Sequence, residues 1–156
     1  MNTLFQRTKS LPPIPQIDLW SLCGRVQPGA FYAAGRARYL PIAESEMAEF
    51  LAATQLDRYV WRTADPVTGL IEVVCCTFSL LLTALVEQER LRQGAPYPLA
   101  FARVEAITDA GGHSLCGFFN ENREWRIVEP QNDGLYTVTR ANALYPGLQI
   151  QNLMFV

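Results

Sequence analysis

The chain has 156 residues, of which 49% are hydrophobic and 18% are charged. Its 13 Lys and Arg residues nearly balance its 15 Asp and Glu residues, so no basic face indicates nucleic acid and no charge block indicates a membrane surface. A chain of this length can bury roughly two-thirds of its unfolded surface in one core. We therefore expect a single domain over residues 1–156, with neither nucleic acid nor a membrane as its partner.

The N-terminal residues 1–38 are expected to form an irregular arm. Residues 10–15 contain three prolines, which favour an extended, polyproline-like backbone. The first ten residues lack an apolar stretch long enough for a signal peptide, which predicts a cytoplasmic, reducing location. The adjacent pair Cys75 and Cys76 and the low cysteine density fit that location, because both argue against a disulfide framework.

A short amphipathic helix is predicted over residues 43–54. Acidic side chains occupy its first turn, where the helix dipole favours them. Met47, Phe50 and Leu51 recur at the spacing that places apolar side chains on one helix face.

A longer helix is predicted to begin around the paired cysteines. From Phe78 onward apolar residues recur at helical spacing, and Gly94 follows the last turn as a stop signal. The apolar run 70–86 is interrupted by Glu72 and is shorter than the ~20 residues that span a membrane. We therefore expect residues 70–74 to lead into the helix as a separate extended segment.

The second half of the chain is rich in predicted strands. Alternating or β-branched segments separated by turn residues indicate an antiparallel sheet. Helices followed by strands in this order predict an α+β fold. The expected strands cover residues 99–107, 114–119, 124–128, 135–138 and the tail 148–156.

Cys75, His113 and Glu129 are the candidate catalytic residues. A cysteine nucleophile needs a base and a group that orients the base, and these three residue types occur in a suitable order. His113 is the only histidine of the chain. In the first helical turn, Cys75 would meet unpaired backbone N–H groups and the positive end of the helix dipole, which favour a thiolate.

The predicted hairpin brings His113 and Glu129 together. If residues 120–122 form a three-residue loop with Asn122 in the left-handed region, His113 lies directly opposite Glu129. Opposed residues share a face and have Cβ atoms about 4.5–5.5 Å apart. A slip by one residue would put the two side chains on opposite faces.

Each of these residues alone also has a structural interpretation. Cys75 and Cys76 suit buried packing, His113 beside two glycines suits a surface or structural role, and Glu129 suits a salt bridge. Zinc ligation by these cysteines, Cys116 and His113 is disfavoured, because adjacent cysteines rarely reach one metal and no C-x-x-C spacing exists.

Three short motifs and one tyrosine resemble the papain-like cysteine protease domain at the C-terminus of the fairy-ring mushroom (Marasmius oreades) agglutinin and related small bacterial and phage proteins. The resemblance covers roughly residues 39–138. It rests on Tyr59, on Cys75-Cys76-Thr77-Phe78-Ser79, on Gly112-His113-Ser114-Leu115 and on Ile127-Val128-Glu129-Pro130-Gln131.

This resemblance implies a papain-like fold, with N-terminal helices, among them a long central helix carrying the cysteine, packed on a C-terminal antiparallel sheet. It implies Cys75 as nucleophile, His113 as general base and Glu129 as the orienting residue, and it favours Cys75 over Cys76. Residues 139–156 would then be a final strand or tail.

The sequence also departs from the family. No cofactor or metal is expected. The family resemblance leaves calcium open, but Val74, Cys76 and Thr77 replace the acidic residues that would flank the nucleophile and support it. The agglutinin's sugar-binding trefoil is absent, since the chain has no threefold repeat, so lectin activity is not implied.

We expect a cysteine peptidase or related acyl-transfer enzyme that acts on an amide or ester of a protein or peptide substrate. Hydrolysis, deamidation and transfer remain open, as does oligomerisation. The alternative is a non-catalytic protease-like binding or structural module, such as a phage particle component or an inhibitor. For the apolar tail 153–156, the interpretations are a partner contact or a final core strand.

Overall fold

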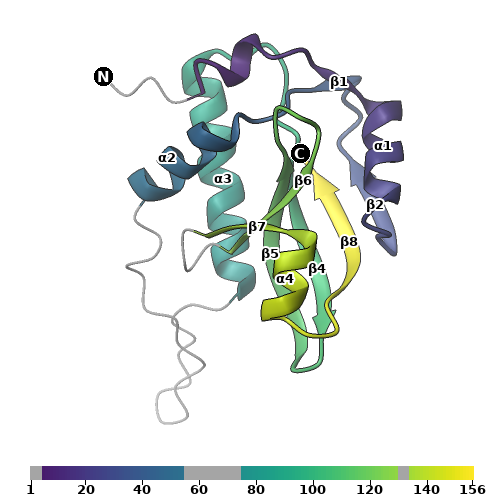
Figure 1. Ribbon diagram of the computed structural model, residues 1–156. Coiled ribbons are helices and arrows are strands. Elements are labelled where there is room, and N and C mark those ends of the chain that lie inside the picture. The colour runs from purple at the N-terminus through teal and green to yellow at the C-terminus, as the bar shows by residue number, and fades with distance from the viewer. Residues whose placement is uncertain (1–4, 55–74, 130–133) are drawn as a thin grey trace.

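The structure, a computed structural model, describes residues 5–54, 75–129 and 134–156 (Figure 1). Within these ranges its helical elements are η1 (Thr8–Ser10), α1 (Gln16–Gly24), α2 (Glu44–Thr54), α3 (Cys75–Gln93) and α4 (Val138–Leu144). The strands are β1 (Ile14–Pro15), β2 (Ala30–Ala33), β3 (Arg38–Tyr39), β4 (Phe101–Thr108), β5 (Gly111–Phe119), β6 (Trp125–Glu129), β7 (Gly134–Thr137) and β8 (Gln149–Phe155).

A six-stranded mixed sheet organises the molecule. Its strand order is β2-β8-β4-β5-β6-β7, and β1 pairs separately with β3. The pair β2–β8 is parallel, whereas β8–β4, β4–β5, β5–β6 and β6–β7 are antiparallel. The C-terminal tail is therefore an inner strand of the sheet, with Leu153 and Phe155 in the core.

Two hydrophobic cores lie on the two faces of this sheet. Because successive side chains of a strand point to opposite faces, Cys116 and Phe118 of β5 join α2 and α3 in one core, whereas Leu115 and Phe119 join α1 and α4 in the other. Figure 1 shows α1 and α3 on opposite sides of the sheet. The sheet is thus covered by helices on both faces.

The predicted papain-like α+β arrangement is wrong. It placed N-terminal helices against a C-terminal antiparallel sheet, but the N-terminal strand β2 belongs to the same sheet and runs parallel to β8. Moreover, α4 from the C-terminal region covers one face and α3 the other. The molecule is a mixed helix-and-strand structure built around a six-stranded mixed sheet.

The two predicted helices are confirmed as α2 and α3. In α2, Met47, Phe50 and Leu51 are buried as their spacing predicted. Helix α3 begins at Cys75 and ends before Gly94, which adopts a φ of 65°. Left-handed backbone of this kind is the usual position of glycine at a helix C-terminus. The extended segment predicted for residues 70–74 lies outside the described residues.

The β5–β6 hairpin differs from its predicted register by two residues. The pairs are Phe119 with Trp125, Gly117 with Ile127, and Cys116 with Val128. The loop still has three residues, because Asn120 and Glu124 close it through a 3.0 Å backbone hydrogen bond. Its left-handed residue is Arg123, with a φ of 59°, rather than Asn122.

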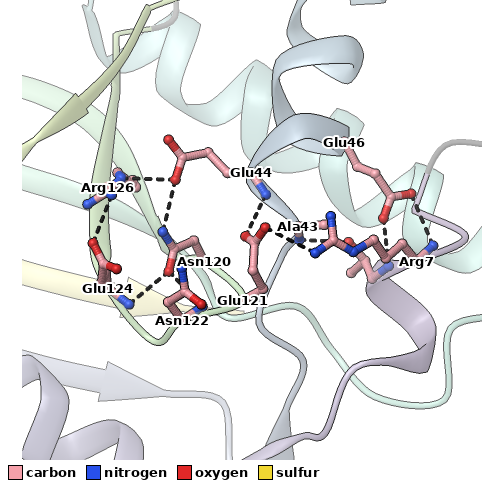
Figure 2. Close-up of polar contacts among 10 residues, drawn as sticks. Arg7, Ala43, Glu44, Glu46, Asn120, Glu121, Asn122, Glu124 and Arg126 are labelled. Carbon is pink, nitrogen blue, oxygen red and sulfur yellow. Dashed lines mark hydrogen bonds and ion pairs between the residues drawn. The ribbon is translucent and has the colours of Figure 1, made fainter.

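Polar contacts fix this hairpin against the start of α2 (Figure 2). One carboxylate oxygen of Glu44 accepts hydrogen bonds from Asn120 Nδ2 at 2.9 Å and from Arg126 Nε at 3.0 Å. The backbone N–H of Glu44 in turn donates to Glu121 Oε2 at 2.9 Å. Anions at a helix N-terminus also interact favourably with its dipole. The hairpin that carries Glu129 on its outgoing strand is therefore held in place.

Candidate functional site

His113 and Glu129 are in contact. His113 Nε2 lies 3.1 Å from Glu129 Oε2, and the two side chains are 16% and 3% exposed. Continuing the register of the hairpin puts Glu129 opposite Leu115, so His113 is its diagonal neighbour on the same face. A shift of two residues preserves the face, which is why the predicted contact forms although the predicted register was wrong.

Tyr145 completes a cluster that the sequence did not reveal. Its hydroxyl donates to Glu129 Oε2, the same oxygen that contacts His113. Its ring lies 5.0 Å from the His113 ring, centroid to centroid, with a tilt of 35°. The residue follows α4, where its backbone N–H bonds to Ala141 at 2.7 Å. The imidazole is thus held by Glu129 on one side and by the Tyr145 ring on another.

Glu129 reaches this cluster from the end of β6. Its second carboxylate oxygen, Oε1, is buried and has no hydrogen-bond partner among the described residues. Burial of an ionised carboxylate is costly unless hydrogen bonds compensate it. The contacts from His113 and Tyr145 to Oε2 provide that compensation, so the three side chains depend on one another.

The alkaline stability of the protein is expected to report the Tyr145 contact. Burial, followed by the hydrogen bond to and the charge of Glu129, raises the pKa of Tyr145 above its ordinary value. Above about pH 10 the unfolded chain releases this proton while the folded chain keeps it, so stability falls as pH rises. In urea titrations at successive pH values from pH 10 upward, the free energy of unfolding of Tyr145→Phe should fall less steeply with pH than that of the wild type. The difference between the two slopes should correspond to at most one proton per molecule. Identical slopes would contradict the contact.

Cys75 lies at the N-terminus of α3 and is partly exposed. Its carbonyl accepts a 2.9 Å hydrogen bond from Ser79 Oγ, one turn later. Helix α3 packs on the face of β5 to which Cys116 points, since Cys116 Sγ lies 3.5 Å from the Ser79 carbonyl oxygen. His113 stands three positions before Cys116, so its side chain points to the other face.

The structure therefore unites two of the three predicted site residues. His113 and Glu129 touch each other, and Tyr145 joins them. Among the described residues, no hydrogen bond links the Cys75 thiol with the imidazole. The Nδ1 edge of His113 likewise has no hydrogen-bond partner in the described ranges, which leaves an oriented polar group available to a ligand.

The four cysteines fall into two environments. Cys23 and Cys116 are buried, and burial raises the pKa of each thiol to about 12. Cys76 is exposed and Cys75 partly so. Because the thiolate is the reactive form, we expect the disulfide reagent DTNB at pH 8 to modify Cys75 and Cys76 in the native protein, and all four thiols only in guanidinium chloride. Rapid reaction of a third thiol in the native protein would contradict the burial of Cys23 and Cys116.

Metal and membrane sites find no support in the described residues. Within residues 5–54, 75–129 and 134–156, no group of three or more His, Cys, Asp or Glu side chains is placed to hold a metal ion. Over the same ranges, no helix is long and apolar enough to cross a membrane.

Solved structures share the fold, although no family model and no curated protein matches the sequence. A complex of PSL1a with E64 superposes with a TM-score of 0.72 at 14% identity, over 92% of this chain and 50% of that chain. Polyporus squamosus lectin, bound to the human-type influenza-binding epitope Neu5Acα2-6Galβ1-4GlcNAc, gives a TM-score of 0.63 at 17% identity, over 98% and 46%. The chain spans about half the length of these structures, and at such identities the likeness concerns the fold alone.

These comparisons overturn the predicted family. The sequence motifs indicated a papain-like cysteine protease, but no family model supports that assignment and the similar structures are of PSL1a and a lectin. The description as a cysteine protease or thiol hydrolase is corrected accordingly. Motifs of a few residues recur on unrelated folds, so they identify a family poorly. Tyr59, Pro130 and Gln131, which contributed to the resemblance, lie outside the described residues.

Proposed function

We propose that the chain is a non-catalytic ligand-binding domain and that His113 contacts the ligand. The observation that carries this proposal is the 3.1 Å contact between His113 Nε2 and Glu129 Oε2, which orients the imidazole and leaves its Nδ1 edge unused. Ligand sites commonly consist of apolar surfaces with a few polar groups held in fixed directions. Further support comes from the similar structures, since PSL1a is in complex with E64 and the lectin is bound to an oligosaccharide.

The chemistry of His113 favours a peptide-like ligand with amide or carboxyl groups. When Nε2–H donates to Glu129, the neutral imidazole accepts a hydrogen bond at Nδ1, and the protonated ring donates one there. Either form finds a partner on an amide, which carries both N–H and C=O. A protein or peptide is therefore the proposed partner class.

E64 is a suitable probe because it carries amide and carboxylate groups and PSL1a is found in complex with it. We expect E64 to raise the thermal unfolding midpoint of Cys75→Ser as much as that of the wild-type protein, since a ligand that binds only the folded state stabilises it without a covalent bond to the thiol. His113→Ala should lose this rise, whereas the surface control Glu124→Ala should keep it. An equal rise in His113→Ala, or none in the wild type at millimolar E64, would overturn the proposal.

A second candidate is acyl transfer by Cys75, His113 and Glu129. It is favoured by the position of Cys75 in the first turn of α3, where backbone N–H groups have no partner within the helix, and by the carboxylate that orients His113. For this chemistry the Cys75 thiol must come within hydrogen-bonding reach of Nδ1, although α3 packs on the opposite face of β5.

The steps of this second candidate follow from those positions. The Cys75 proton passes to His113 Nδ1, and the sulfur forms a bond to the carbonyl carbon of an amide or ester. The carbon bond to the leaving nitrogen or oxygen breaks, and that atom takes the proton from the imidazolium. An acceptor amine or hydroxyl group then gives its proton to His113 and bonds to the thioester carbonyl carbon, and the departing sulfur takes a proton back to restore the thiol. The backbone N–H of Cys75 is the oxyanion donor.

Selective alkylation separates the two candidates. Brief iodoacetamide treatment near pH 6, followed by peptide mass spectrometry, should modify Cys75 ahead of its exposed neighbour Cys76 if acyl transfer operates. His113→Ala should remove that preference. In the wild-type protein E64 should add covalently to Cys75, whose sulfur bonds to an epoxide carbon of E64 while the carbon–oxygen bond breaks and the oxygen takes the proton. Equal, slow alkylation of both thiols would exclude the acyl-transfer candidate and leave binding as the function.

A further inference from the structure

Two neighbouring cavities open on the face of the sheet that α1 and α4 cover, away from α3. The first has a volume of about 590 Å³ and lies between the α1–β2 loop, α4 and the start of β8. The second, of about 350 Å³, lies beside α1 and the start of β2. Gln27 and Gly29 line both cavities, so the two adjoin at these residues, and together they are called the groove. Both volumes fall in the range of small-molecule sites.

The larger cavity is lined by polar side chains that the protein itself does not use. Among the described residues, none of these side chains has a hydrogen bond or ion pair with another part of the chain. The lining supplies amide groups, which both donate and accept, and one guanidinium, which only donates. These side chains are Arg25, Gln27, Asn142, Gln149 and Gln151.

The described side chains that line the groove carry positive charge only. Arg25 is the single charged side chain among the described residues that line the two cavities. A guanidinium binds a carboxylate through two parallel hydrogen bonds. The larger cavity therefore suits a ligand that combines an anionic carboxylate with several neutral hydroxyl or amide groups.

The smaller cavity adds an aromatic surface. Trp20 is 58% exposed, and its ring meets Phe31 edge-on at 4.7 Å between centroids, which holds the indole in place. An exposed, immobilised indole offers an apolar face to the C–H groups of a sugar ring while its N–H remains available for a hydrogen bond. Trp20 thus supplies the flat apolar contact that the larger cavity lacks.

Gly29 is required for the shape of the groove. Its backbone N–H bonds to the Ile150 carbonyl oxygen at 3.3 Å, which brings the α1–β2 loop against β8. A Cβ atom on Gly29 would lie 2.6 Å from the Gln151 carbonyl oxygen, closer than side chains allow. Only glycine permits this approach, which places Gln27 and Gln151 in the lining of the same cavity.

We propose that this groove binds an oligosaccharide that carries a carboxylate, with Arg25 facing the carboxylate and Trp20 beneath a neighbouring sugar ring. The amide side chains hydrogen-bond the hydroxyl and acetamido groups between these two points. The groove contains none of the residues of the His113 cluster, so this second binding site is independent of the function proposed for that cluster.

A matched pair of oligosaccharides tests the proposal. By calorimetric titration at low salt, we expect hyaluronan tetrasaccharide, which alternates N-acetylglucosamine with glucuronate, to bind at least tenfold more tightly than chitotetraose, which lacks the carboxylates. Arg25→Ala should weaken binding about tenfold and abolish the preference. Trp20→Ala should weaken both ligands, and His113→Ala should change neither.

The folded state of each variant is checked by its circular dichroism spectrum, and both substituted side chains are exposed at the surface. Absence of hyaluronan binding at millimolar concentration would overturn the proposal. So would binding that Arg25→Ala and Trp20→Ala leave unchanged, or equal affinity for chitotetraose. An amide spectrum recorded by NMR during the titration should shift at Arg25, Gln27 and the Trp20 indole, and shifts confined to the His113 cluster would also contradict the groove.

Discussion

Glu129→Ala is expected to lower the free energy of unfolding by about 3 kcal/mol. The carboxylate is 3% exposed and accepts from both His113 and Tyr145. Removing it leaves the Tyr145 hydroxyl and one imidazole nitrogen without their partner and opens a cavity at the end of β6. Replacement of a whole buried polar cluster by apolar groups can be neutral, but the removal of one member is not.

Urea denaturation at pH 7 measures this effect. The matched control is Glu124→Ala, since Glu124 is 52% exposed and its ion pair with Arg126 is at the surface. Exposed pairs contribute at most about 1 kcal/mol, so the control should remain close to the wild type. A Glu129→Ala midpoint indistinguishable from that of the control would show that the carboxylate does not hold the cluster together. The same variant should lose the E64-dependent rise in thermal midpoint.

Asn120→Ala is expected to cost about 2–4 kcal/mol, because one buried side chain makes three hydrogen bonds. Asn120 is 2% exposed, and its Oδ1 accepts from the backbone N–H groups of Asn122 and Glu124 at 3.0 and 2.9 Å. Its Nδ2 donates to Glu44. The loss of these bonds frees the loop whose geometry sets the register of β5 and β6.

The neighbouring Asn122→Ala is the control for that substitution, because the Asn122 side chain is exposed and only its backbone N–H takes part in the loop. We expect the control to unfold within about 0.5 kcal/mol of the wild type. If the hairpin register positions Glu129, then Asn120→Ala should also reduce the rise in thermal unfolding midpoint that E64 causes. Equal stability of the two variants would contradict the role assigned to Asn120.

Local patterns predicted two of the helices, α2 and α3, and most of the strands in the described part of the chain. The apolar spacing of Met47, Phe50 and Leu51 was enough to define α2, and Gly94 marked the end of α3. These signals are local, because helical periodicity and stop residues lie within one segment. Residues 1–38 were expected to form an irregular arm, but they include α1 and β2. These two elements were missed because the prediction followed the prolines of residues 10–15 and found no periodic pattern of apolar residues after them.

Pairings between distant segments could not be predicted in the same way. The parallel contact of β2 with β8 joins residues more than a hundred positions apart, and nothing in either segment specifies it. The hairpin register was missed because left-handed backbone was assigned to Asn122, whereas the structure places it at Arg123. The error of two residues was harmless for the site, since an even shift keeps His113 and Glu129 on one face.

The candidate site was predicted only in part for a related reason. Tyr145 reaches Glu129 from the end of α4, which is a tertiary contact without a local motif. Cys75 was grouped with His113 because of their order along the chain. That order does not determine on which face of the sheet the His113 side chain lies. Cys116 points to α3, and His113 is an odd number of residues away from it, so the sequence could not place the thiol beside the imidazole.

The imidazole ring of His113 allows the most direct test of the proposed binding role. Because His113 is the only histidine in the chain, a ring-selective ¹H–¹⁵N spectrum contains a single imidazole and needs no assignment. On titration with E64, we predict that the Nδ1 resonance shifts strongly while Nε2 keeps the signature of its contact with Glu129. Saturating E64 that leaves both ring nitrogens unchanged would contradict the assignment of His113 as the ligand-contacting residue.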